Sequence, residues 1–334
     1  MAAHAPPLTG NDIFALLRSR INVAAIDGQV RRPFRFLLCG DPGLITELRA
    51  TLLFAYPQDG VPADAPSTLE IIDPAHGPRG PINDARCVIF VGRPGDAAGA
   101  RLDLLTGLKL PVFVLTVDPA LEPAGPATPP ARGEAAAYIV HNLQREALHG
   151  RVFPHLMHAC KGVEIAVGRR LPGLRRTVAT KLTLDCANRS LQVAVASAVV
   201  DHVPVLGLVL GAFASAGDMV AITGLQMVLL LNIAAAYGRD PDLQRMWELL
   251  PIVGGGFGLR ALARELSGFI PVAGIAIKGA IAYAGTVVVG EAGAFYYEQG
   301  QHMDKAQMTA LYVETKDAAL QLARDLWTKI TSRR

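Results

Sequence analysis

The residues best placed for chemistry follow the first apolar run of the chain, Phe34–Cys39. A turn that contains Gly40 and Gly43 comes next, and a helical pattern over Ile45–Phe54 follows the turn. A strand, a glycine-containing turn and a helix form the layout of a phosphate-binding loop, where backbone N–H groups at the helix start hold phosphates. Gly40 and Gly43 are therefore the candidate cofactor-binding residues of this turn, if a nucleotide binds.

The same turn lacks the side chains that nucleotide hydrolysis needs. When the first glycine of the motif G-x-x-x-x-G-K-[ST] is aligned with Gly40, Ile45 stands in the position of the second glycine, Thr46 in that of the lysine and Glu47 in that of the Ser or Thr. The missing lysine would contact the β- and γ-phosphates, and the missing hydroxyl would bind Mg²⁺. We expect no hydrolysis, no catalytic residue, no metal site and no cofactor. The alternative is an atypical loop that binds GTP or GDP with Mg²⁺.

Two aspartates follow later apolar runs in the order expected of a GTPase domain. Asp73 ends the run LEIID and precedes Gly77, one residue further away than in D-x-x-G. Asp118 ends LTVD in the place of the guanine-reading N-K-x-D, without its Asn and Lys. Asp73 near Mg²⁺ and Asp118 near guanine complete the candidate set, and the predicted domain is P-loop GTPase-like but degenerate.

Short apolar runs bounded by Gly, Pro or Asp predict strands that are covered on both faces. The runs are Phe34–Cys39, Thr68–Ile72, Cys87–Val91, Val112–Val117 and Ala137–Val140. Helical patterns at 45–54 and 98–105 fall between them, and this alternation predicts an α/β domain with a mostly parallel sheet. The Pro- and Ala-rich stretch 119–132 is expected to be an exposed loop.

Helical patterns alone continue beyond residue 141, and they predict an apolar helical bundle. The expected helices are 141–170, 174–202, 204–215, 218–237, 241–250, 258–268 and 271–298, and an amphipathic helix at 304–331 follows. Between residues 191 and 238 the only charges are Asp201 and Asp218. Asp218 is expected to cap the helix that it begins. A lead-in helix is expected at 11–30.

Composition and charge bear on where the protein works. Hydrophobic residues make up 51% and charged residues 18% of the chain, and the formal net charge of +3 is too small to predict nucleic-acid binding. Residues 141–190 hold nine Lys or Arg and three acids directly before the apolar region. Such a block favours contact with anionic lipid at the cytoplasmic side of a membrane, and the alternative is a solvated helix face. The four scattered cysteines indicate neither disulfides nor zinc.

Two apolar segments, 204–238 and 269–297, resemble the bacterial "domain of unknown function 697" family. The matching features are a Pro-led entry, Asp218 and Gln226 before Ala-Ala-Tyr-Gly, and Thr286 and Gly290 before an aromatic pair. The resemblance covers roughly residues 180–300. It implies a helical module that is often fused to, or encoded beside, small GTPases of the Era/dynamin-like type, in a family that includes YcjF-type inner-membrane proteins. It implies no biochemical activity.

These observations predict four segments: a lead-in helix at 1–30, a degenerate GTPase-like domain at 31–145, an apolar helical module at 146–300 and a C-terminal amphipathic helix at 301–334. The expected function is a non-enzymatic, membrane-associated interaction or scaffold protein at the cytoplasmic membrane. Expected partners are a protein, such as a GTPase, and membrane lipid. The alternatives are an active or nucleotide-binding GTPase and a soluble oligomeric scaffold.

Overall fold

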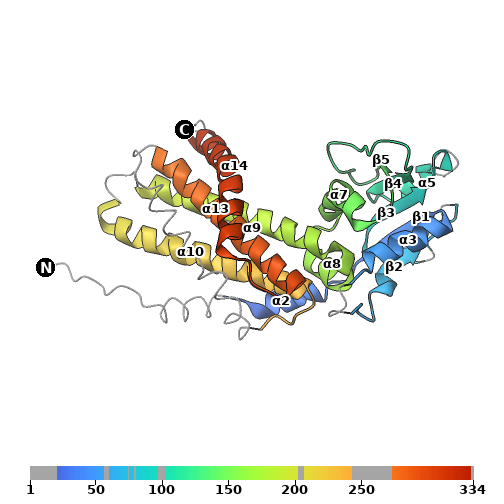
Figure 1. The fold of residues 1–334 in the computed structure, drawn as a ribbon, viewed down its shortest axis with the longest axis horizontal. Coiled ribbons are helices and arrows are strands. Elements are labelled where there is room, and N and C mark those ends of the chain that lie inside the picture. The colour runs from blue at the N-terminus through green and yellow to red at the C-terminus, as the bar shows by residue number, and fades with distance from the viewer. Residues whose placement is uncertain are drawn as a thin grey trace. The chain divides into compact units, whose positions relative to one another are not determined.

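The computed structural model describes residues 21–55, 60–73, 75–78, 80–96, 102–201, 207–242 and 273–331. The chain divides into two compact units. Asp27–Lys181 and Ala235–Arg239 form the first, which we call the α/β unit, and the remaining residues form the second, the helical unit. Figure 1 shows the sheet and the helices of both units.

One five-stranded parallel sheet forms the centre of the α/β unit. Its strands are β1 (Arg35–Gly40), β2 (Leu69–Ile71), β3 (Ala85–Gly92), β4 (Val112–Val117) and β5 (Ala135–Val140). Their order is β2-β1-β3-β4-β5, and every neighbouring pair is parallel. The prediction of a mostly parallel sheet from five apolar runs is confirmed, with strand ends that differ by a few residues.

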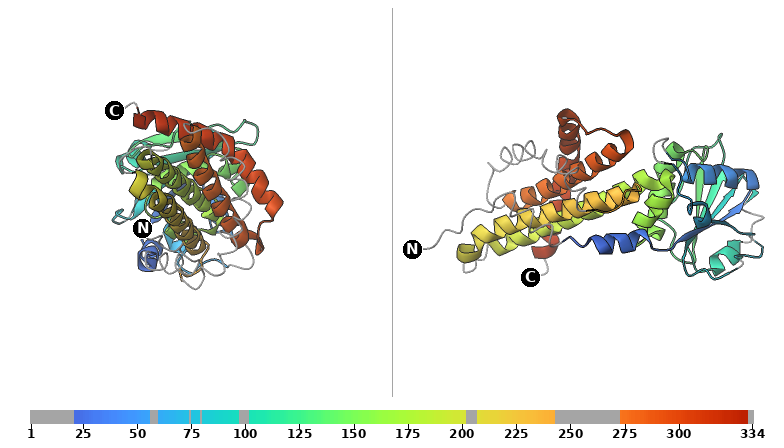
Figure 2. Two further views of the ribbon diagram at one scale, coloured as in Figure 1. Left: turned by 90° about the vertical axis from the view of Figure 1, so that its left-hand side faces the viewer. Right: turned by 90° about the horizontal axis from the view of Figure 1, so that it is seen from below.

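Both faces of this sheet are covered, because successive strand side chains point to opposite sides. Leu105 of α5 (Leu102–Gly107) shares a buried cluster with Leu37, Val88 and Val112. The helix α3 (Pro42–Leu52) lies on the opposite face of the sheet (Figure 2). Its buried side chains are Leu44, Ile45, Leu48 and Leu52. Continuous apolar runs therefore form the strands, as expected of a parallel sheet between two helical layers.

Three short helices follow β5 in the segment 141–170, for which the sequence predicts a single long helix. The prediction is wrong, because the segment folds as α6 (Arg145–His149), α7 (Val152–Ala159) and α8 (Glu164–Arg170). Gly150 separates α6 from α7, and Gly162, with φ +82°, lies between α7 and α8. A positive φ cannot continue a right-handed helix.

The remaining short elements are α2 (Val23–Val30), the 3₁₀ helix η1 (Pro66–Thr68) and the 3₁₀ helix η2 (Pro172–Leu174). The predicted lead-in helix 11–30 is observed from Val23, and residues before 21 lie outside the described part.

Long helices build the helical unit: α9 (Arg175–Asp201), α10 (Gly207–Ala236), α13 (Ala273–Gln299) and α14 (Lys305–Thr331). The first residues of α9 and the last residues of α10 belong to the α/β unit. The helices predicted at 174–202, 271–298 and 304–331 are confirmed by α9, α13 and α14.

Asp218 does not begin a helix. The described parts of the predicted helices 204–215 and 218–237 form one continuous helix, α10 (Gly207–Ala236), so the capping role is wrong. The N–H groups of a helix interior already bond to carbonyls four residues earlier. Apart from residues 241 and 242, the predicted helices 241–250 and 258–268 lie outside the described ranges.

The helical unit has its own core, built from small and apolar side chains of α9, α13 and α14. The buried members are Ala187, Leu191, Val195, Ala280, Tyr283, Ala284, Val287, Val288, Tyr312, Ala319 and Ala323. At Gly279 an added Cβ would lie 2.9 Å from the side chains of both Leu191 and Val195, so α9 and α13 approach closely there. Within the described ranges, no helix has the length and hydropathy that a membrane crossing requires.

Candidate functional site

All four predicted site residues lie on or next to the carboxyl edge of the sheet. Gly40 ends β1, Asp73 follows β2 and Asp118 follows β4, while Gly43 lies in the first turn of α3. Because the strands are parallel, their carboxyl ends meet at one edge. The chain order reverses between β1 and β3, and ligands of open α/β sheets bind outside such a switch point. The structure therefore places the Gly40 turn where a ligand site is expected.

Gly40 is required by packing between β1 and β3. Its φ is +119°, and an added Cβ would lie 1.9 Å from the carbonyl oxygen of Val91. The next residue, Asp41, donates its backbone N–H to that oxygen over 2.9 Å. The glycine thus has a structural reason to be present that involves no phosphate.

The N-terminus of α3 is occupied by a carboxylate of the chain itself. Asp41 is the N-cap, and its Oδ1 accepts the N–H of Leu44 over 2.9 Å. Pro42 follows and has no N–H, and a Cβ at Gly43 would lie 3.1 Å from the same Oδ1. Asp41 therefore holds the position and the negative charge that a phosphate would have at this helix start.

The hydroxyl in the position of the missing lysine is also engaged. Thr46 Oγ1 donates to the carbonyl oxygen of Pro42 over 2.9 Å, within the first turn of α3. Glu47, in the position of the Mg²⁺-binding hydroxyl, is exposed. No Lys or Arg occurs among residues 41–48, so this turn has no cation that could neutralise a triphosphate.

A second carboxylate occupies the turn after β3, beside the Gly40 turn. Asp96 Oδ2 accepts the N–H of Arg93 over 2.6 Å, and a Cβ at Gly92 would lie 2.8 Å from the Asp96 Cβ. The sequence interpretation missed both Asp41 and Asp96. The available signals were an Asp-Pro pair before a helix and Pro-Gly-Asp after a strand, both of which favour capping and turns.

The carboxylate of Asp73 is held in a local turn. It accepts the N–H of Ala75 over 2.8 Å and lies 2.6 Å from His76 Nδ1. These two contacts hold the pKa of the Asp73 carboxyl below its ordinary value. The extra residue relative to D-x-x-G lets Asp73 and Gly77 form an isolated bridge, in which the Gly77 N–H donates to the Asp73 carbonyl over 2.7 Å.

Asp118 likewise bonds to its own loop, since its Oδ1 accepts the N–H of Ala120 over 2.9 Å. Three strand spacings separate β2 from β4 in this sheet, about 14 Å, so Asp73 and Asp118 cannot share one ion. In the described chain, no group of three His, Cys, Asp or Glu side chains could hold a metal ion.

Much of the basic block at 141–190 is used for contacts inside the α/β unit. Arg170 pairs with Asp64 over 2.6 Å, Arg169 donates to the carbonyl oxygen of Arg239 over 3.1 Å, and Arg175 lies over the ring of Tyr237. These guanidinium groups connect distant segments of the α/β unit. The number of cations left for lipid is therefore smaller than the charge count of the block indicates.

Comparison with protein-family models, with curated proteins and with solved structures finds no match to this chain. The geometry of the sheet edge and the helical unit are therefore the features that bear on function.

Proposed function

We propose that this chain is a non-enzymatic interaction protein with a GTPase-like α/β unit that does not turn over nucleotide. The strand order and the helix after β1 support a Rossmann- or P-loop-like layout. The Gly40 turn, Asp73 and Asp118 follow β1, β2 and β4 in the order of a GTPase domain. Residues of the helical unit would then contact a membrane or a protein partner, as the resemblance to the "domain of unknown function 697" family implies.

The observation that carries this proposal is the hydrogen bond from the Leu44 N–H, at the start of α3, to the Asp41 carboxylate. A nucleotide phosphate at this helix start would compete for that N–H and would meet the Asp41 carboxylate, and a second carboxylate, Asp96, lies in the turn after the neighbouring strand β3. Like charges at close range repel, and residues 41–48 hold no Lys or Arg that could offset the repulsion by Asp41. A protein partner could still bind at this carboxyl edge of the sheet, because protein binding does not require a phosphate site.

The test is calorimetric titration of the full chain with GTP, GDP and ATP in the presence of Mg²⁺. We expect no saturable heat from the wild-type chain and no phosphate release. The Asp41→Ser variant is the informative partner, because serine keeps a capping oxygen but removes the charge. It is expected to fold with little loss of stability, whereas Asp41→Ala is expected to lose about 1 kcal/mol.

Micromolar GTP binding by the wild-type chain that is abolished in Asp118→Ala would overturn the proposal and favour the active GTPase. Weak nucleotide binding by Asp41→Ser alone would agree with the proposal, because it would identify the Asp41 charge as the obstacle.

The second candidate is an oligomeric scaffold that needs no bilayer. The core of the helical unit favours it, because α9, α13 and α14 already bury apolar side chains against one another. Leu184, Val313 and Leu322 remain exposed on α9 and α14 and could contact a second copy.

A further inference from the structure

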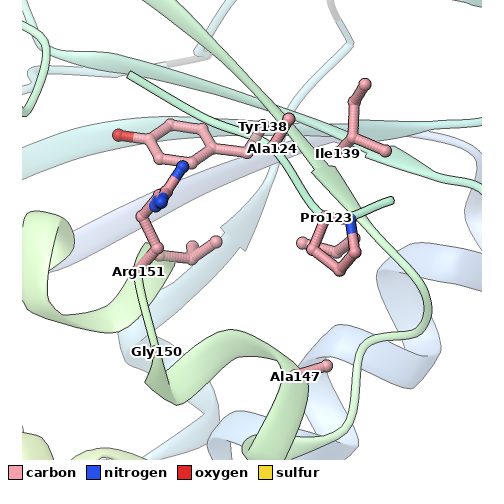
Figure 3. Close-up of a pocket in the computed structure, with 9 residues that line it drawn as sticks. Pro123, Ala124, Tyr138, Ile139, Ala147, Gly150 and Arg151 are labelled. Carbon is pink, nitrogen blue, oxygen red and sulfur yellow. The ribbon is translucent and has the colours of Figure 1, made fainter. Parts of the chain in front are cut away.

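A cavity of about 230 Å³ lies beside the outer strand β5 (Figure 3). The strands β3 and β4 separate β5 from β1 and its Gly40 turn. Its walls come from β5 at Tyr138–Val140, from the turn at Pro123–Ala124 and from the junction of α6 and α7. All of these segments belong to the α/β unit. The cavity includes none of the residues on which the proposed function depends.

The walls of this cavity are fixed by hydrogen bonds and close packing. Ala124 and Ile139 exchange two backbone hydrogen bonds of 3.1 and 2.8 Å. The Tyr138 ring stacks on Phe113 with centroids 5.8 Å apart, and its hydroxyl lies 3.0 Å from His155 Nδ1. A site with walls that are already ordered loses little conformational entropy when a ligand binds.

Gly125 permits close packing of its turn against the Tyr138 ring and Arg151. An added Cβ at Gly125 would lie 2.7 Å from Cδ1 of Tyr138 and 3.0 Å from Cδ of Arg151. The turn therefore packs directly on the tyrosine ring and on the stem of the arginine.

Arg151 gives the cavity its charge. Figure 3 shows its side chain beside the Tyr138 ring, with Pro123 and Ala147 on the other side of the space. Its Nη1 donates to the carbonyl oxygen of Gly125 over 2.9 Å. Within the described chain no carboxylate pairs with Arg151, and its Nε and Nη2 have no protein acceptor. The walls otherwise present mainly aliphatic side chains, including Val140.

We propose that this cavity binds a small organic monocarboxylate with a compact apolar body. The carboxylate would accept hydrogen bonds from Nε and Nη2 of Arg151, the paired geometry that a guanidinium offers. The apolar body would lie between Pro123 and Ala147. One cation matches one negative charge, and a cavity below the roughly 300–1,000 Å³ of drug-sized sites limits the ligand to a small molecule.

The test uses the full chain and three probes: benzoate, its neutral shape analogue benzamide, and inorganic phosphate. We expect saturable binding of benzoate by calorimetry and ligand-observed NMR, and weaker or no binding of the other two. Arg151→Gln is expected to weaken benzoate binding on the order of 10- to 100-fold, because it removes a charged hydrogen-bond donor. Ala147→Phe, which fills the cavity, is expected to abolish binding.

Arg132→Gln is the matched control. Arg132 lies in the same loop and donates to a backbone carbonyl, that of Lys109 over 3.1 Å, but it does not line the cavity. Its benzoate affinity should equal that of the wild type. Absence of saturable benzoate binding up to the solubility limit would overturn the proposal. Equal binding of benzamide, binding of phosphate alone, or unchanged affinity in both cavity variants would also overturn it.

Discussion

Two constraints act at Gly40, a φ of +119° and the Val91 carbonyl oxygen 1.9 Å from the position of an added Cβ. The nearest atom is backbone, so it cannot rotate away. We expect Gly40→Ala to lower the free energy of unfolding by about 3 kcal/mol or more, measured by chemical denaturation. Gly107→Ala is the control, because nothing lies within 4 Å of its added Cβ, and it should change stability by less than about 1 kcal/mol. Equal effects of the two changes would contradict the packing account.

An ion-pair cluster at the opposite edge of the sheet predicts a pH dependence. Arg35 Nη2 lies 2.6 Å from Asp84 Oδ1, and Glu70 also pairs with Arg35. The hydrogen bond from Arg35 holds the pKa of the Asp84 carboxyl below its ordinary value. A lowered folded-state pKa means that the pair stabilises the fold above the unfolded value of about 3.9, and that this stabilisation is lost as pH falls through the folded value.

We therefore expect the denaturant concentration at the unfolding midpoint of the wild type to decrease as the pH is lowered from about 5 to about 3. In Asp84→Asn the slope over this interval should be smaller, and stability at pH 7 should be lower by on the order of 1 kcal/mol. A variant whose pH profile parallels that of the wild type would show that Asp84 does not contribute to the acid response.

At the scale of elements, one buried hydroxyl joins three helices of the helical unit. Thr286 Oγ1 of α13 lies 3.2 Å from Gln226 Nε2 of α10 and 3.0 Å from Ser190 Oγ of α9. It also donates to the carbonyl oxygen of Ala282 over 2.8 Å, so it can accept hydrogen bonds from the other two groups. Thr286 and Ser190 are fully buried. Such a node fixes the register of the helices, because a shifted helix would leave its members without partners.

Thr286→Val keeps the side-chain shape but removes the hydroxyl. We expect it to lower stability by about 1–3 kcal/mol, because the groups on α9 and α10 lose their partner. Thr309→Val is the control, since its hydroxyl bonds only to the carbonyl of Lys305 in the same helix, over 2.7 Å. Thermal unfolding followed by circular dichroism compares the two, and a larger loss in Thr309→Val would contradict a role for the node.

The element that the sequence predicts least well is 141–170. Its apolar periodicity continues through Gly150 and Gly162, so the pattern alone predicts one helix. The structure divides it into α6, α7 and α8, and each of these helices buries an apolar side chain of its own: Leu148, Phe153 and Val167. Tertiary packing therefore overrides a local pattern that is compatible with a single helix.

At the scale of the whole molecule, the membrane proposal and the scaffold alternative predict different behaviour. If the basic block contacts lipid, the full chain should float with vesicles that contain anionic lipid, and high salt should release it. Arg189 is an exposed cation of that block, so Arg189→Glu should weaken vesicle binding on the order of 5- to 30-fold. Arg324→Glu, an exposed position on α14 outside the block, should have little effect.

A chain that ignores vesicles and runs as a stable oligomer in size-exclusion chromatography with light scattering would contradict membrane association. That result would favour the scaffold, and the exposed Leu184, Val313 and Leu322 would then be the first candidates for the contact between copies.

The sequence by itself determined the five strands, the glycine turn after β1 and the absence of a phosphate-binding lysine. These are local properties, since apolar runs, turn residues and missing side chains can be read without knowing which segments meet. Only the tertiary structure decided that Gly40 packs on Val91, that Asp41 and Asp96 occupy the turns at the switch point, and that α10 continues through Asp218. Those features depend on neighbouring strands, on hydrogen-bond partners and on helix packing, which are set when distant parts of the chain come together.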